Sequence, residues 1–166
     1  MRAISRRIEH DLEARDGLHV NLVSALAVLV APPASAQSAH DPCALLTRQQ
    51  VSAAAGSTVG AGQSIGTSGC QWSTPDDPSA RSVKVVVTLS LLDERAFPGG
   101  APSPGFVLTT VRGVGDDAVF TTVGPFTSFA VKKGRSTFVV RVYGVRDPAR
   151  QQAIEKSLAS DVLARW

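Results

Sequence analysis

The two cysteines of this chain, Cys43 and Cys70, constrain its fold more than any other feature of the 166 residues. The sequence TRQQ at 47–50 lies between them and has the form of a capping box, which predicts a helix from there to Gly56. Trp72 follows the second cysteine in a predicted strand, where alternation places it on the same face as Cys70. The folded domain is therefore expected to begin with a helix and a strand.

The first 36 residues have the pattern of a signal peptide. Arginines precede an apolar run at 20–31, and the sequence ASA at 34–36 matches an A-x-A cleavage site. The apolar run is about a dozen residues long, whereas a membrane-spanning helix needs roughly 18 to 20. Four acidic residues before the run are unusual in such a leader: Glu9, Asp11, Glu13 and Asp16.

These features predict a signal peptide over 1–36 and a single domain over 37–166, without a transmembrane segment in the mature chain. The alternative is that the apolar run forms an amphipathic or buried helix of the folded domain. Cleavage would deliver the protein to the periplasm, the cell envelope or the medium, so we expect an exported protein.

Export favours a disulfide between Cys43 and Cys70, because free thiols oxidise in such compartments. Closing a loop of about 26 residues would stabilise the fold by roughly 3 to 4 kcal/mol. The alternative is a zinc site, but the histidines lie in or beside the leader: His10, His19 and His40. Two thiols and one tail histidine make a poor zinc site, so we predict no metal and no cofactor.

Alternating apolar residues predict antiparallel strands. The clearest spans 82–91 and places five residues on one face: Val83, Val85, Val87, Leu89 and Leu91. Other strand candidates are 106–111, 118–123, 127–132 and 136–143, with a short edge strand near 58–59. A final helix is expected to start at Asp147-Pro148. The order predicts an α+β domain with one curved antiparallel sheet of five to six strands, covered by an N-terminal and a C-terminal helix.

Charge excludes one class of partner. The formal net charge of +3 is small for this length, and the sequence shows no cluster of basic residues of the kind that nucleic-acid binding requires. Lys132, Lys133 and Arg135 lie at a predicted hairpin turn. We interpret this turn as solubilising, and contact with an anionic membrane or wall polymer is the alternative.

No convincing catalytic constellation is present. The sequence GQSIG at 62–66 matches the esterase pattern G-x-S-x-G, but a helix precedes it, a strand follows it, and no histidine comes after His40. Asp116 and Asp117 are adjacent in a glycine-rich turn, where two carboxylates could bind Ca²⁺ or form an acid/base pair. Aspartates in turns more often accept hydrogen bonds from their own backbone, and we favour that interpretation.

Several short motifs resemble, in order and spacing, a family of small bacterial exported or cell-envelope domains of unknown function. They are DPCALLT at 41–47, CQW at 70–72, GVGDDA at 113–118 and KG at 133–134. The resemblance covers residues 40–166 and implies a Cys43–Cys70 disulfide, an α+β fold and no catalytic residue. The chain is also loosely similar to extracytoplasmic sensor domains of bacterial receptors.

We therefore expect a non-catalytic accessory domain that binds a protein or small ligand of the cell envelope. Its candidate sites are the open face of the sheet and the loops 98–105 and 113–117, the latter containing Asp116 and Asp117. The alternative is a small hydrolase or metal-dependent enzyme that uses Asp116 and Asp117. A pocket with converging polar groups near Asp116 would favour that alternative.

Overall fold

A computed structural model describes residues 41–76, 83–100 and 103–166. The predicted signal peptide lies outside these residues. In the part of the chain that the structure describes, no helix is both long enough and apolar enough to cross a membrane.

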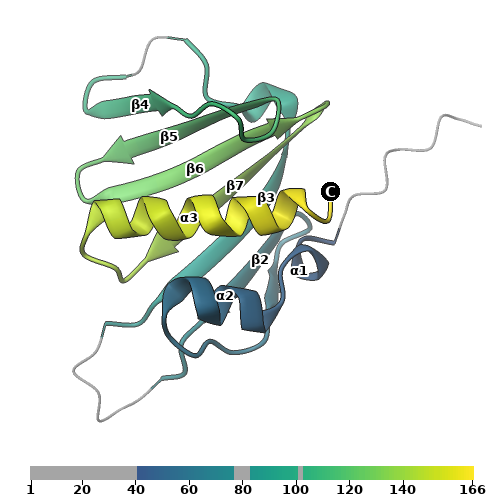
Figure 1. Cartoon of the computed structure of the whole chain (residues 1–166), viewed down its shortest axis with the longest axis vertical. Helices are drawn as coiled ribbons and strands as arrows, with labels where there is room; N and C mark the ends of the chain where they lie inside the picture. Colours follow the sequence, from purple (N-terminus) through teal and green to yellow (C-terminus); the bar gives the residue numbers. More distant parts are fainter. Residues whose placement is uncertain (1–40, 77–82, 101–102) are drawn as a thin grey trace, which may run out of the picture. The chain divides into compact units, whose positions relative to one another are not determined.

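One antiparallel sheet of seven strands forms the framework, in the order β1-β2-β3-β7-β6-β5-β4 (Figure 1). The strands are β1 Gln63–Ile65, β2 Gly69–Ser73, β3 Val86–Asp93, β4 Phe106–Thr110, β5 Asp117–Val123, β6 Phe126–Lys133 and β7 Ser136–Tyr143. The helices are α1 Pro42–Leu45, α2 Arg48–Ala55 and α3 Pro148–Leu163, with a 3₁₀ turn, η1, at Glu94–Ala96. The α+β class, the single antiparallel sheet and the two predicted covering helices are confirmed.

The predicted count of five to six strands is wrong, because the sheet has seven and includes β1, in a segment where no strand was predicted. All three β1 residues are exposed, so they show none of the alternation that reveals a half-buried strand. The expected edge strand near 58–59 does not form. Val59 is buried, and its N–H donates to Ser52 Oγ at 3.1 Å rather than to a neighbouring strand.

The strand predicted at 82–91 begins later, at Val86. Both of its neighbours end at this point, since Val86 pairs with Ser73 of β2 on one side and with Tyr143 of β7 on the other. Val83 therefore lies beyond the ladder and is 54% exposed, contrary to its expected place on the apolar face. Val87 and Leu89 are fully buried, as the alternation predicted.

The predicted capping box starts α2. Thr47 Oγ1 accepts a hydrogen bond from the Gln50 N–H at 3.2 Å, and Gln50 Oε1 accepts one from the Thr47 N–H at 3.0 Å. Gly56 ends the helix with φ +66°, a left-handed conformation that suits glycine. The single turn α1, capped by Asp41, was not predicted.

The disulfide joins Cys43 of α1 to Cys70 of β2, with 5.1 Å between their Cα atoms. Cys70 and Trp72 are both buried in the main core, as their shared face predicted. A Cβ on Gly62 would lie 2.8 Å from Cys70 Sγ and 2.8 Å from Trp72 Nε1. Residue 62 is therefore a glycine because the chain passes directly against the disulfide and the indole.

The main core lies between the helices and one face of the sheet. Asp147 caps α3 and Pro148 begins it, as predicted, and Ile154, Leu158 and Val162 are buried. In Figure 1, α3 runs across the sheet and α2 lies on the same side. The opposite face of the sheet carries no helix among the described residues, and this open face holds the candidate site.

Candidate functional site

A segment that follows β3 turns back over the open face. Asp93 Oδ1 accepts a hydrogen bond from the Arg95 N–H at 2.9 Å and so caps η1. Glu94 then reaches β6, where its Oε2 lies 3.8 Å from Lys132 Nζ. The first contact stabilises the turn η1, and the second joins the segment to the sheet.

Phe97 extends this anchoring with an apolar contact. It packs on a small second core on the open face, formed by Val119, Ala130 and Val139, with Leu108 at its side. The four residues come from four adjacent strands, in the order β4, β5, β6 and β7. One phenylalanine of the segment therefore covers the middle of the open face.

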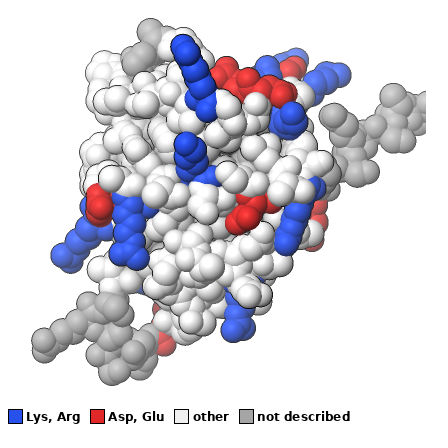
Figure 2. Space-filling view, viewed as in Figure 1, with Lys and Arg blue, Asp and Glu red and all other residues white. Residues whose placement is uncertain are grey.

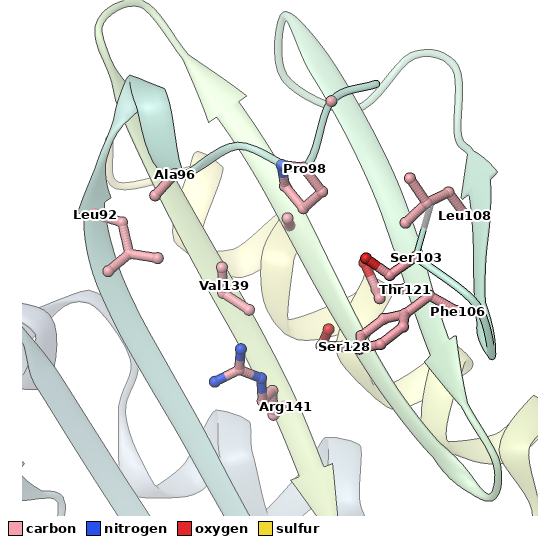
Figure 3. Close-up of a pocket in the computed structure, with 12 residues that line it drawn as sticks. Leu92, Ala96, Pro98, Ser103, Phe106, Leu108, Thr121, Ser128, Val139 and Arg141 are labelled. Carbon is pink, nitrogen blue, oxygen red and sulfur yellow. The ribbon is translucent and has the colours of Figure 1, made fainter. Parts of the chain in front are cut away.

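A hollow of about 320 Å³ lies beside this second core, between the segment and the sheet (Figure 3). Its volume falls within the range of small-ligand sites, roughly 300 to 1,000 Å³. Most of its lining is apolar, as is usual for such sites. The lining residues are Leu92, Ala96, Pro98, Gly99, Ser103, Phe106, Leu108, Thr121, Ser128, Ala130, Val139 and Arg141.

Four polar side chains line the same hollow. Ser103 lies shortly before β4, and Thr121, Ser128 and Arg141 come from β5, β6 and β7, respectively. Arg141 is the only charged residue of the lining. Among the described residues it has no ion pair and no hydrogen bond, so its guanidinium is available to a ligand.

An exposed apolar row extends the hollow along the open face. Phe106 pairs with Val123, and Val123 pairs with Phe126, so their side chains lie on one face of the sheet. Their exposed fractions are 44%, 37% and 56%, respectively. Phe106 also lines the hollow, which makes the row and the hollow one continuous surface.

Asp116 is held by the turn between β6 and β7. Its Oδ2 accepts a hydrogen bond from the Gly134 N–H at 2.6 Å, and its Oδ1 lies 3.0 Å from Lys133 Nζ. The bond from Gly134, then that from Lys133, holds the pKa of Asp116 below its ordinary value. Its carboxylate thus joins the loop before β5 to this hairpin turn.

Asp117 makes a different contact, since its Oδ1 accepts a hydrogen bond from the N–H of the next residue, Ala118, at 3.0 Å. Neither aspartate lines the hollow, and the structure does not place the two candidate loops at one site. The loop 98–105 contributes Pro98, Gly99 and Ser103, whereas 113–117 contributes nothing to the lining. A binding role for Asp116 and Asp117 stays a prediction.

The basic hairpin turn is partly neutralised. Lys132 pairs with Glu94, and Lys133 pairs with Asp116. On the face drawn in Figure 2, lysine and arginine side chains are dispersed and interspersed with acidic ones rather than gathered into one patch.

A buried polar cluster on the helix side of the sheet was missed by the sequence analysis. Gln151 and Glu155 of α3 are 2% and 0% exposed, and both bond to Thr127 of β6. Thr127 Oγ1 lies 2.9 Å from Gln151 Oε1 and 3.0 Å from Glu155 Oε2. The hydroxyl has one hydrogen, so it can donate to only one of these oxygens.

Protonation of Glu155 satisfies this cluster, because its O–H can then donate to Thr127 while Thr127 donates to Gln151. Burial raises the pKa of Glu155 to about 7, against the opposing hydrogen bonds from Thr127 and Val142 and the charge of Arg141. The sequence does hold a signal for this pair, since Gln151 and Glu155 are polar residues four apart beside the apolar stripe of α3.

Within residues 41–76, 83–100 and 103–166, no three His, Cys, Asp or Glu side chains lie close enough to hold a metal ion. Comparisons of the chain with protein-family models, with curated proteins and with solved structures found no match.

Proposed function

We propose that this protein is an exported, non-catalytic accessory domain that binds a small ligand of the cell envelope in the open-face hollow. One observation carries the proposal: the segment from Asp93 to Gly100 contacts the sheet through Glu94 and Phe97, and a hollow remains between this segment and the sheet. If the segment served only to cover the sheet, filling this space with side chains would stabilise the fold further, because close packing adds dispersion contacts.

Two further features support the proposal. The Cys43–Cys70 disulfide suits an oxidising compartment and therefore export. We include in the proposal that the chain belongs to the family of small bacterial exported domains that it resembles. The predicted leader would direct the chain there, and intact-mass measurement of the exported protein should find cleavage after Ala36.

The alternative, an enzyme that uses Asp116 and Asp117, has less support. Asp116 already accepts from Gly134 and Lys133, so a substrate would have to displace the contacts that join the loop to the hairpin. Asp117 accepts from its own backbone neighbour. These contacts favour the turn-forming interpretation of both carboxylates.

Methyl chemical shifts in the full chain test the proposal, in titrations with decanoate below its micellar concentration and with decanol below its solubility limit. We expect at least one probe to shift the methyl groups that line the hollow, such as those of Leu108, Ala130 and Val139. Ser128→Phe should abolish the shifts, because a phenyl ring at this position occupies the hollow.

Thr109→Phe is the matched control. Thr109 is exposed on β4 and alternates with Leu108, so the same ring is added on the other face of the sheet. This variant should bind as the unmodified chain does. If neither probe moves the hollow methyls, or if Ser128→Phe binds normally while folded by near-ultraviolet circular dichroism, the proposed binding site is wrong.

A further inference from the structure

The positive charge of Arg141 indicates which class of ligand the hollow would bind. This inference rests on the proposed function, that the hollow is a binding site. Arg141 projects from β7 at one end of the hollow, and its guanidinium lies on the open face (Figure 3). Thr88, its partner in β3, is uncharged. Within the described part of the chain this guanidinium forms no hydrogen bond and no ion pair.

The two acidic residues between the lining residues Leu92 and Ala96 each lie close to a basic side chain. Glu94 lies 3.8 Å from Lys132, and Asp93 lies 4.0 Å from Arg95. Neither carboxylate is therefore a free competitor for Arg141. A guanidinium presents several N–H donors in a fork that matches carboxylate or phosphate oxygens, so the end of the hollow that holds Arg141 suits an anion.

Hydroxyl groups near this end add donors for the remaining oxygens of an anion. Ser128 lies on β6, and Thr121 pairs with it across the β5–β6 ladder. Ser103 and Thr121 also line the hollow (Figure 3). One head group could be contacted by a charged donor and neutral hydroxyls, as is common in ligand sites.

The rest of the hollow suits an apolar body. Val139, Leu108 and Pro98 line it, and Leu92 and Phe106 remain 37% and 44% exposed. The row Phe106, Val123 and Phe126 continues this apolar surface away from the hollow. Apolar side chains held partly in water at a concave site are stabilised when an apolar ligand covers them.

We propose that the hollow binds a small amphiphile with an anionic head, which pairs with Arg141 while the apolar body lies against Val139, Leu108 and Phe106. The proposal specifies that the head group is anionic. A carboxylate and a phosphate share the required chemistry, and the experiment below separates them.

Calorimetric titration of the full chain with decanoate, decyl phosphate and decanol tests this class, since the three share one apolar chain. We expect decanoate or decyl phosphate to bind about ten- to hundredfold more tightly than decanol, the gain expected from a charge-assisted hydrogen bond. The tighter of the two anions identifies the head group. Arg141→Gln should remove the preference and leave decanol binding unchanged.

Arg48→Gln is the matched control, because Arg48 is exposed on α2, away from the hollow. It should retain the preference for the anions. If decanol binds as tightly as the anions, or if Arg141→Gln leaves the preference intact, the anionic class is wrong while the hollow remains a binding site. If no probe binds, both this inference and the proposed function are overturned.

Discussion

The backbone N–H of Val142 donates to the Glu155 carboxyl at 3.1 Å. Pairing between β6 and β7 runs from Lys133 opposite Ser136 to Phe129 opposite Val140 and stops there, although both strands continue. Thr127, on the part of β6 that no longer pairs with β7, donates its N–H to Gln151 Oε1 at 3.2 Å. Two side chains of α3 therefore satisfy backbone groups that the ladder leaves free, as buried N–H groups require.

Stability should depend on pH through Glu155. Its folded pKa of about 7 lies above the ordinary value of 4.5, so the folded state holds a proton that the unfolded state loses first. The stabilisation is complete below pH 4.5 and is lost as pH rises through about 7. From linkage, the free energy of unfolding should fall by about 3 kcal/mol over this range. Urea unfolding at a series of pH values measures it.

Glu155→Gln separates this effect from other carboxyl groups. Glutamine reproduces the protonated acid, since its Oε1 can accept from Val142 and its Nε2 can donate to Thr127. We expect the variant to match the unmodified chain near pH 4.5 and to be more stable above pH 7. Equal pH profiles for the two proteins would contradict a neutral Glu155.

Arg141 should influence the same titration from the open face, because its positive charge favours the ionised carboxylate of Glu155. Arg141→Gln should therefore move the midpoint of the Glu155-dependent stability change to higher pH. Saturating decanoate should act in the same direction if it neutralises the guanidinium. A midpoint that does not move in Arg141→Gln would show that the guanidinium is electrostatically isolated from α3.

Two buried threonines should respond in opposite ways to replacement by valine. Thr137 is fully buried, and its Oγ1 has no hydrogen-bond partner among the described residues, so Thr137→Val should stabilise the fold by about 1 kcal/mol. Thr127 links Gln151 and Glu155, so Thr127→Val should cost about 2 kcal/mol. Urea unfolding distinguishes the signs, and a loss in both variants would indicate a partner for Thr137.

Local signals in the sequence sufficed for both ends of α2, for the start of α3 and for most strands. The Thr47–Gln50 capping box, the Asp147-Pro148 start of α3 and the alternation about Val87 and Leu89 each involve residues close in the chain. The position of β7 between β3 and β6 was not predicted, since several apolar strands could pair with one another equally well. β1 was missed because a three-residue exposed edge has no periodicity.

The candidate site was predictable only in outline. The open sheet face and the loop 98–105 were named, but Arg141 was not, because the hollow is assembled from residues 92 to 141 and no motif joins them. Asp116 and Asp117 were predicted as a candidate site because they are adjacent in sequence, but Asp117 accepts from the backbone of Ala118, and Asp116 accepts from the Gly134 N–H and from Lys133. Contacts between residues distant in sequence decide which polar side chain lies in a concavity.

The disulfide should account for a large part of the stability. Cys43 and Cys70 are 27 residues apart, and cross-linking a loop of this length restricts the unfolded chain by roughly 3 to 4 kcal/mol. The double replacement Cys43→Ser with Cys70→Ser should lose about that much in urea unfolding. A reductant should destabilise the unmodified chain similarly and leave the double variant unchanged. Equal stability with and without reductant would contradict this role.

Two glycines of the turn before β5 should differ sharply when replaced by alanine. Both have positive φ, +78° at Gly113 and +60° at Gly115. A Cβ at Gly113 meets open space, so Gly113→Ala should cost only the left-handed strain of about 1 kcal/mol. A Cβ at Gly115 would lie 2.6 Å from Lys132 O and from Val131 Cγ1, and the backbone oxygen cannot move without disturbing the β5–β6 ladder.

Gly115→Ala should therefore cost about 2 to 4 kcal/mol, clearly more than Gly113→Ala. It should also weaken the bond from the Gly134 N–H to Asp116, because residue 116 follows the displaced backbone directly. Urea unfolding measures the first effect, and hydrogen exchange of the Gly134 amide measures the second. Similar losses in both variants would mean that the loop moves aside, and that Asp116 does not hold it against the hairpin.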